Sequence, residues 1–312
     1  MKGKIFRIIN NIVALSFLGI ALSGCGGGGN SAPPSTVSGI AATGAPMSGT
    51  AFLKDAANNS EISTTINAQN GAFSFDVSGK TAPFLLRAGS LYSMSGGPGT
   101  ANINPLSNLM VADMGSFKNM SSLNTFYRNP SGPVLSSMFG NMSTARLHLR
   151  QKMGPLMSAY GVVNADPMSG AFTIGRGMDK MFDDVKMTID SNGNVTMMYV
   201  NGTSVFTGQM GNMAGGTMLS GNIMTPGANP VVNGITITPG VAKLQVNGTQ
   251  QFATNIQVTW SVISQNGGSI TSGGLYTAPA LQGMYLVKAT SVADPTKSAI
   301  ATVMVGNMGM TM

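Results

Sequence analysis

Residues 256–262, Ile-Gln-Val-Thr-Trp-Ser-Val, alternate apolar and polar side chains without interruption. Successive side chains of a β-strand point to opposite faces of its sheet, so this alternation predicts a strand with one buried face. The same period of two recurs in four further runs, at residues 235–238, 244–246, 285–289 and 301–305. Turn-forming Asn-Gly and Gly-Gly pairs separate the runs at the spacing of a β-sandwich. We therefore predict a small antiparallel sandwich over residues 234–306.

Four short motifs in this region resemble the group 2 bacterial immunoglobulin-like domains. They are the opening strand at residues 235–239 (ITITP), the second-strand entry at 248–252 (GTQQF), the core-tryptophan strand at 258–260 (VTW) and the Gly-x-Tyr-x-Ala-Pro turn at 274–279 (GLYTAP). The resemblance implies a sandwich with Trp260 in its core. Such domains serve as spacers, adhesin stalks and carbohydrate-side modules, so the resemblance leaves the function open.

A second sandwich is predicted over residues 37–100. An Asn-Gly turn at residues 70 and 71 precedes Phe73, Phe75 and Val77, and this pattern is typical of a β-hairpin with one buried face. The segment resembles the carboxypeptidase regulatory-like domains. Residues 44–49 (GAPMSG) match the Gly-x-Pro-x-x-Gly opening of that family, and Asn67 with residues 71–75 matches its aromatic hairpin. Despite its name, that family supplies no catalytic residues.

Between the two sandwiches, residues 101–207 change in character. Apolar side chains with helical spacing predict two or three helices between residues 102 and 161, and Asn104 before Pro105 is placed to cap the first. Two alternating runs around residues 190–194 predict a hairpin, with a third strand at Val205 and Phe206. Residues 208–233, rich in Gly and Met, are expected to form a linker or a loose β-arm. The predicted fold class is mainly β, with two small antiparallel sandwiches flanking a helical and hairpin middle region.

The N-terminus has the layout of a secretory signal. Residues 1–24 contain a basic start and an apolar run that is too short to span a bilayer. The run ends in Leu22, Ser23, Gly24 and Cys25, which resembles the lipobox of bacterial lipoproteins. The resemblance implies that Cys25 becomes the lipidated first residue of the mature chain. Gly26 in place of Asp implies export to the outer membrane. Residues 25–36 then read as a flexible Gly/Pro/Ser-rich spacer.

Composition argues against several function classes. The 312-residue chain is only 9% charged and has a single His and a single Cys. The net charge of +7 includes Lys2, Lys4 and Arg7, which leaves +4 on the rest, too little and too scattered for a nucleic-acid surface. His148, between Arg146 and Arg150, is expected on a solvated helix face. No Gly-x-Ser-x-Gly turn accompanies it, so we predict no catalytic residue.

Two groups of polar residues invite a metal or catalytic interpretation. Asp179 and Asp183, with Asp184 beside them, have the spacing of one helix face, as paired carboxylates or a cation site would need, but a salt-bridged turn with the neighbouring lysines is the preferred alternative. The second group starts like a calcium loop, with Asp190 followed by Asn at alternate positions. Gly193 stands at position four instead of six and no Glu follows, so an Asx-type hairpin turn is favoured.

Methionine is unusually abundant, with 25 residues. Seven of them form two clusters of thioethers that are a candidate for holding Cu(I), namely Met210, Met213, Met218 and Met224 with Met308, Met310 and Met312 in the tail at residues 307–312. The alternative is that Met replaces Leu as a general core residue.

The sequence as a whole predicts a non-enzymatic lipoprotein of the outer membrane, facing either the periplasm or the outside. It would attach to the membrane through a lipid on Cys25, and its sandwiches would contact a glycan or another envelope protein. No cofactor, metal or nucleic acid is predicted as a partner. The alternative function is a Met-rich Cu(I)-binding envelope protein.

Overall fold

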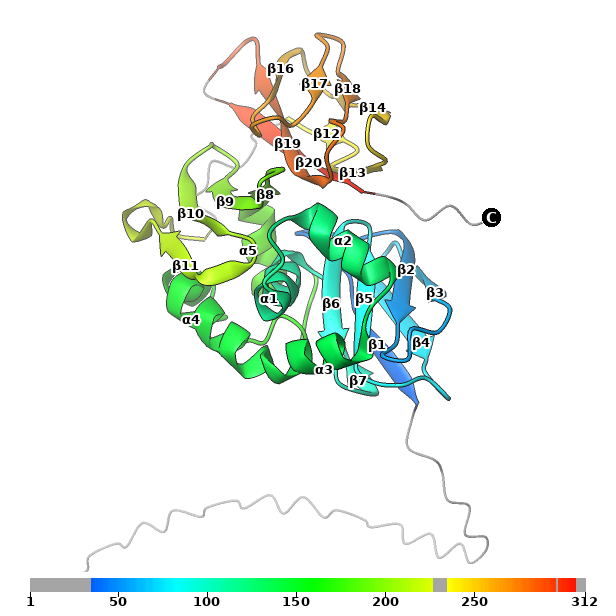
Figure 1. Cartoon of the computed structure of the whole chain (residues 1–312). Coiled ribbons are helices and arrows are strands. Elements are labelled where there is room, and N and C mark those ends of the chain that lie inside the picture. The colour runs from blue at the N-terminus through cyan, green and yellow to red at the C-terminus, as the bar shows by residue number, and fades with distance from the viewer. Residues whose placement is uncertain (1–34, 227–234, 296, 307–312) are drawn as a thin grey trace, which may run out of the picture. The chain divides into compact units, whose positions relative to one another are not determined.

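A computed structural model describes residues 35–226, 235–295 and 297–306, and within them the fold is mainly β with five α-helices (Figure 1). This confirms the predicted fold class. Cys25 and the methionines of the tail lie outside the described residues. None of the helices in these ranges has the length and apolar character needed to cross a bilayer.

The first seven strands form two sheets around a shared apolar core, in the orders β4-β1-β7 and β3-β2-β5-β6. Their bounds are Thr36–Ile40 (β1), Gly49–Lys54 (β2), Ile62–Ile66 (β3), Ala72–Asp76 (β4), Phe84–Ala88 (β5), Leu91–Ser95 (β6) and Gly99–Thr100 (β7). The predicted strand is confirmed, because Phe73 and Phe75 lie on β4 and are buried, with their rings edge to face at 5.8 Å. The predicted hairpin is wrong, because β4 pairs with β1 whereas the preceding strand β3 pairs with β2 in the other sheet. Gly71 supplies the positive φ of 73° that the turn requires.

Four helices follow, where two or three were expected. They are Pro105–Gly115 (α1), Met120–Arg128 (α2), Gly132–Gly140 (α3) and Met142–Ala159 (α4). The predicted cap is confirmed, since Ser107 donates its backbone N–H to Asn104 Oδ1 at 2.9 Å and Pro105 stands in the first turn. The polar second helix starts at a second capping box, built by Asn119 and Ser122. It buries Met120, Leu123, Asn124 and Tyr127.

The helix Met178–Asp184 (α5) leads into four antiparallel strands, Val185–Ile189 (β8), Asn194–Tyr199 (β9), Ser204–Gln209 (β10) and Asn212–Met218 (β11), followed by a 3-10 turn at Ser220–Asn222. The predicted hairpin and third strand are confirmed. Strand β11 lies in the stretch expected as linker or loose arm, and it pairs with β10 from Phe206↔Met218 to Gln209↔Asn212. A side chain at Gly216 would collide with the Phe206 ring, so this glycine lets the two strands close over the ring.

Nine further strands build the C-terminal sandwich, which has an apolar core cluster of its own. They are Ile237–Thr238 (β12), Val241–Leu244 (β13), Thr249–Gln251 (β14), Ala253–Thr254 (β15), Val258–Val262 (β16), Ser269–Ile270 (β17), Leu275–Thr277 (β18), Gly283–Ser291 (β19) and Ser298–Val305 (β20). Trp260, expected in the core, is only partly buried, and its ring lies 6.1 Å from that of Phe252. Ile256 is 40% exposed and precedes β16, a strand that pairs with β19 alone.

Methionine is a core residue throughout the described part of the chain. Eighteen of the 25 methionines are buried there, among them Met210 and Met213 of the candidate Cu(I) cluster. Both are 1% exposed or less and belong to the main apolar cluster. Their packing is what a flexible substitute for Leu would show.

Five of the six tyrosines carry a raised pKa, and burial is the main cause in each. The pKa of Tyr285 rises to about 12, and those of Tyr92, Tyr127, Tyr160 and Tyr276 rise further above the usual value. The fold therefore favours neutral tyrosine. This stabilisation is complete below the unfolded pKa of about 10 and is lost as the pH rises towards the folded values.

We expect stability to fall steeply above pH 10, by up to about 1.4 kcal/mol per pH unit for each ionising tyrosine. Tyrosinate absorbance and circular dichroism, followed together in an alkaline titration, check this. The expected result is one transition in which the tyrosines ionise as the strands melt. Ionisation of most tyrosines near pH 10 with the circular dichroism unchanged would contradict it.

Candidate functional site

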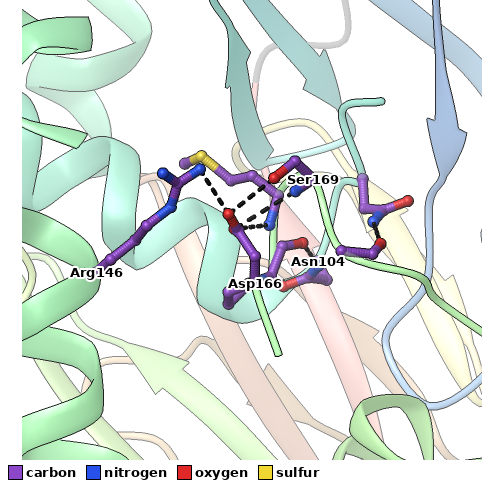
Figure 2. Close-up of polar contacts among 8 residues, drawn as sticks. Asn104, Arg146, Asp166 and Ser169 are labelled. Atoms are coloured by element: carbon purple, nitrogen blue, oxygen red, sulfur yellow. Dashed lines mark hydrogen bonds and ion pairs between the residues drawn. The ribbon is translucent and has the colours of Figure 1, made fainter. Parts of the chain in front are cut away.

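Helix α5 is positioned by the irregular segment that precedes it, residues 160–177, and polar contacts hold that segment in place (Figure 2). Arg146 of α4 pairs with Asp166 at 2.5 Å, and the same carboxylate accepts the hydroxyl of Ser169 at 2.8 Å. On the other side, Asn104 donates its side-chain amide to the carbonyl of Pro167 at 2.7 Å. Arg146 therefore helps to hold this segment against α4.

Two of the three carboxylates of α5 have separate hydrogen-bond partners. Asp179 is fully buried and accepts the backbone N–H groups of Gly44 and Gly175 at 3.1 and 2.7 Å. Asp184 accepts from Lys180 Nζ at 2.7 Å and from the hydroxyl of Tyr160 at 2.9 Å. The salt-bridged interpretation is thus confirmed for Asp184. In the part of the chain that the structure describes, no three His, Cys, Asp or Glu side chains gather as a metal site would need.

The loop over residues 43–48 approaches the end of α5 very closely. Gly44 has a φ of +94°, and a Cβ there would lie 2.6 Å from the backbone nitrogen of Asp183. Only glycine fits this position, both for its backbone conformation and for its packing. The first glycine of the Gly-x-Pro-x-x-Gly motif is therefore required by the contact between the first sandwich and α5.

This loop forms one wall of a cavity of about 550 Å³, a volume typical of small-molecule sites. The other walls come from the α5–β8 junction and from the C-terminal sandwich. The lining residues are 43–48, Asp183, Lys186, 239–243, Gln250 and Ile300.

The charged groups of the cavity are two lysines and one aspartate. Lys186 Nζ donates to the carbonyl of Phe182 at 2.6 Å, and Lys243 Nζ donates to the carbonyl of Ser48. Burial lowers the pKa of both lysines and raises the pKa of Asp183. Each ammonium has three donors, so one carbonyl leaves hydrogen-bonding capacity for a further acceptor.

Thr43 adds an unsatisfied hydroxyl to the same cavity. The residue is 6% exposed, and its Oγ1 has no hydrogen-bond partner within the described residues. A buried polar atom without a partner is costly, and a bound polar group would remove that cost. With the apolar side chains of Met47 and Val241 in the lining, the cavity is suited to a small ligand that has a negative group, hydroxyls and a C–H face.

Of these lining groups, only Asp183 belongs to a pair whose spacing in the sequence suits a catalytic or cation site. In the sequence, Lys186 stands out only as a neighbour of the α5 aspartates, and Lys243 and Thr43 belong to no motif that predicts a charged site. Thr43 lies more than a hundred residues before the two lysines, so only the tertiary fold brings the three groups to one cavity. Cys25, the one residue predicted to be modified, lies outside the described residues.

Two other polar groups have structural partners. His148, expected on a solvated helix face, instead pairs through Nδ1 with Asp113 Oδ2 at 2.8 Å and so joins α4 to α1. The second oxygen of Asp113 accepts the backbone N–H of Met213 at 2.9 Å. The Asx-type turn is confirmed, because Asp190 Oδ1 accepts the backbone N–H groups of Asn192 and Asn194 at 2.9 and 2.8 Å.

Comparison with known proteins gives no family: no family model and no curated protein sequence matches the chain.

Proposed function

We propose that the chain is a non-enzymatic, lipid-anchored protein of the outer membrane that presents its β-sandwich modules to a glycan or to another envelope protein. The observation that carries this proposal is the sequence from Leu22 to Cys25, which follows a short apolar run and matches a lipobox. The motifs at residues 44–49 and 274–279 support it, since the regulatory-like and immunoglobulin-like families that they resemble are non-catalytic modules.

The anchor would act by holding the modules at a surface. Each buried CH₂ of an acyl chain contributes about 0.8 kcal/mol, and more than one chain gives stable attachment. A tethered module then meets any partner on the same or a neighbouring surface at a high effective concentration, so weak individual contacts suffice. The cavity lined by Thr43, Lys186 and Lys243 supports a binding role, because its groups are donors and cations set in an apolar wall.

Binding of the purified, fluorescently labelled full chain to whole cells and to a glycan array tests this role. We expect binding that unlabelled protein competes away, either to cells of the producing strain or to a restricted set of glycans. Binding to both surfaces no stronger than that of a labelled albumin control would contradict the proposal.

A further inference from the structure

A second cavity adjoins the first and shares residues with it. It has a volume of about 250 Å³, and Ser48 and Lys243 line both cavities. Lys243 therefore stands where the two spaces meet. A ligand longer than one small ring could extend from one cavity into the other past this ammonium group.

Three cationic side chains line the two cavities. Lys186 lines the first, Lys243 lines both, and Arg87 lines the second. The Arg87 guanidinium is centred 4.5 Å from the Phe52 ring, and its Nη2 lies 3.9 Å from Glu61. Neither lysine forms an ion pair within 4.0 Å in the described residues, although Asp183 lines the same cavity as both of them. The two lysines therefore offer positive charge that no carboxylate of the described residues pairs within 4.0 Å.

The first cavity also offers groups suited to hydroxyls. The unpartnered Oγ1 of Thr43 can donate and accept, and the carboxylate of Asp183 can accept. The first cavity therefore combines two lysines, one carboxylate and one hydroxyl with the apolar side chains of Met47 and Val241. A simple inorganic anion would use only the lysines, whereas an apolar ligand would leave Thr43 and the charges unpaired. A hydroxylated carboxylate uses all of them.

From this combination we infer that the two cavities bind an acidic sugar, with the carboxylate held between Lys186 and Lys243 and ring hydroxyls on Thr43 and Asp183. The inference deepens the proposed function by naming the ligand class, and it rests on that proposal for placing the site at a cell surface. A second sugar unit would extend past Lys243 over Phe52 and Arg87.

Isothermal titration calorimetry on the full chain in detergent micelles tests this assignment. The probes are glucuronate, galacturonate and digalacturonate, with glucose and galactose as neutral counterparts and inorganic phosphate as the bare anion. We expect at least one acidic sugar to bind at least tenfold more tightly than its neutral counterpart and than phosphate. The disaccharide should bind more tightly than galacturonate.

Two variants and a matched control locate the site. We expect Lys243→Gln and Lys186→Met each to weaken binding of the acidic sugar at least tenfold, whereas Lys288→Gln, on β19 and lining neither cavity, leaves it unchanged. Thermal unfolding shows which variants fold. If Lys186→Met does not fold, the affinity of Lys243→Gln for the acidic sugar alone tests the inference.

Three results would overturn the inference: no acidic sugar binds, phosphate binds as tightly as the sugars, or a folded Lys243→Gln variant retains full affinity. Because the chain is free in micelles, none of these results depends on anchoring. Failure of the proposed function would appear separately, in membrane attachment and in binding to cells.

Discussion

We expect Cys25→Ala to abolish formation of the lipidated chain, so that the protein is either cleaved elsewhere and released into the soluble fraction or left as an uncleaved precursor. Cys25 carries the only thiol in the sequence, so no other side chain offers a sulfur for a thioether-linked lipid. No helix of the described residues is long and apolar enough to cross a bilayer. The expected effect is therefore nearly all or none.

Fractionation of cells that express each variant, followed by a salt wash of the membranes, measures this effect. Ser23→Ala is the matched control, because it keeps a small residue two positions before Cys25 and leaves the thiol in place. We expect this control to remain with the membranes. Equal membrane association of Cys25→Ala and the parent chain would remove the basis of the proposed anchor.

Asp179→Asn is expected to cause the largest loss of stability among single polar substitutions in the described residues. The carboxylate is fully buried and accepts N–H groups from Gly44 and Gly175, which belong to segments more than a hundred residues apart. An amide of the same shape offers one acceptor and places its NH₂ against the other N–H. Hydrogen bonds to a charged acceptor contribute about 1.5–3 kcal/mol each, so the loss is about 3 kcal/mol.

A loss of this size lowers the melting temperature by roughly 5 °C in a chain of this length. Differential scanning calorimetry measures it. Asp183→Asn is the control on the same helix: its carboxylate accepts no hydrogen bond in the described residues, and burial raises its pKa, so neutralising it should change stability by under about 1 kcal/mol. Equal melting temperatures for Asp179→Asn and the parent chain would show that the buried carboxylate does not hold the loop.

Local rules explain the parts of the fold that the sequence predicts. Strands β4 and β9 follow from alternation, because a strand with one buried face has apolar side chains at every second position. The start of α1 follows from Asn104 and Pro105, whose capping chemistry acts over only three residues. Neither inference needs knowledge of what the element packs against.

Other elements depend on tertiary contacts that have no local signal. Strand β11 contains Gly215 and Gly216, a composition that predicts a linker. The missing side chain at Gly216 is what lets the strand lie over the ring of Phe206. The local sequence predicts a solvated His148, because its partner Asp113 is 35 positions away and gives no local signal.

The candidate cavity shows the same limitation more strongly. Its lysines at positions 186 and 243 and its hydroxyl at Thr43 are ordinary residues in their local sequence. They become a site only when the 43–48 loop, the α5–β8 junction and the C-terminal sandwich pack together. Gly44 gave the one usable signal, since a glycine that must pack against backbone marks the place where these segments meet.

Intact-mass spectrometry of the protein extracted from membranes tests the central claim, lipid attachment at Cys25, most directly. The account predicts a mature chain that begins at Cys25 and carries the added mass of several acyl groups on that residue. A chain that begins at any other residue, or that begins at Cys25 without added acyl mass, would contradict it.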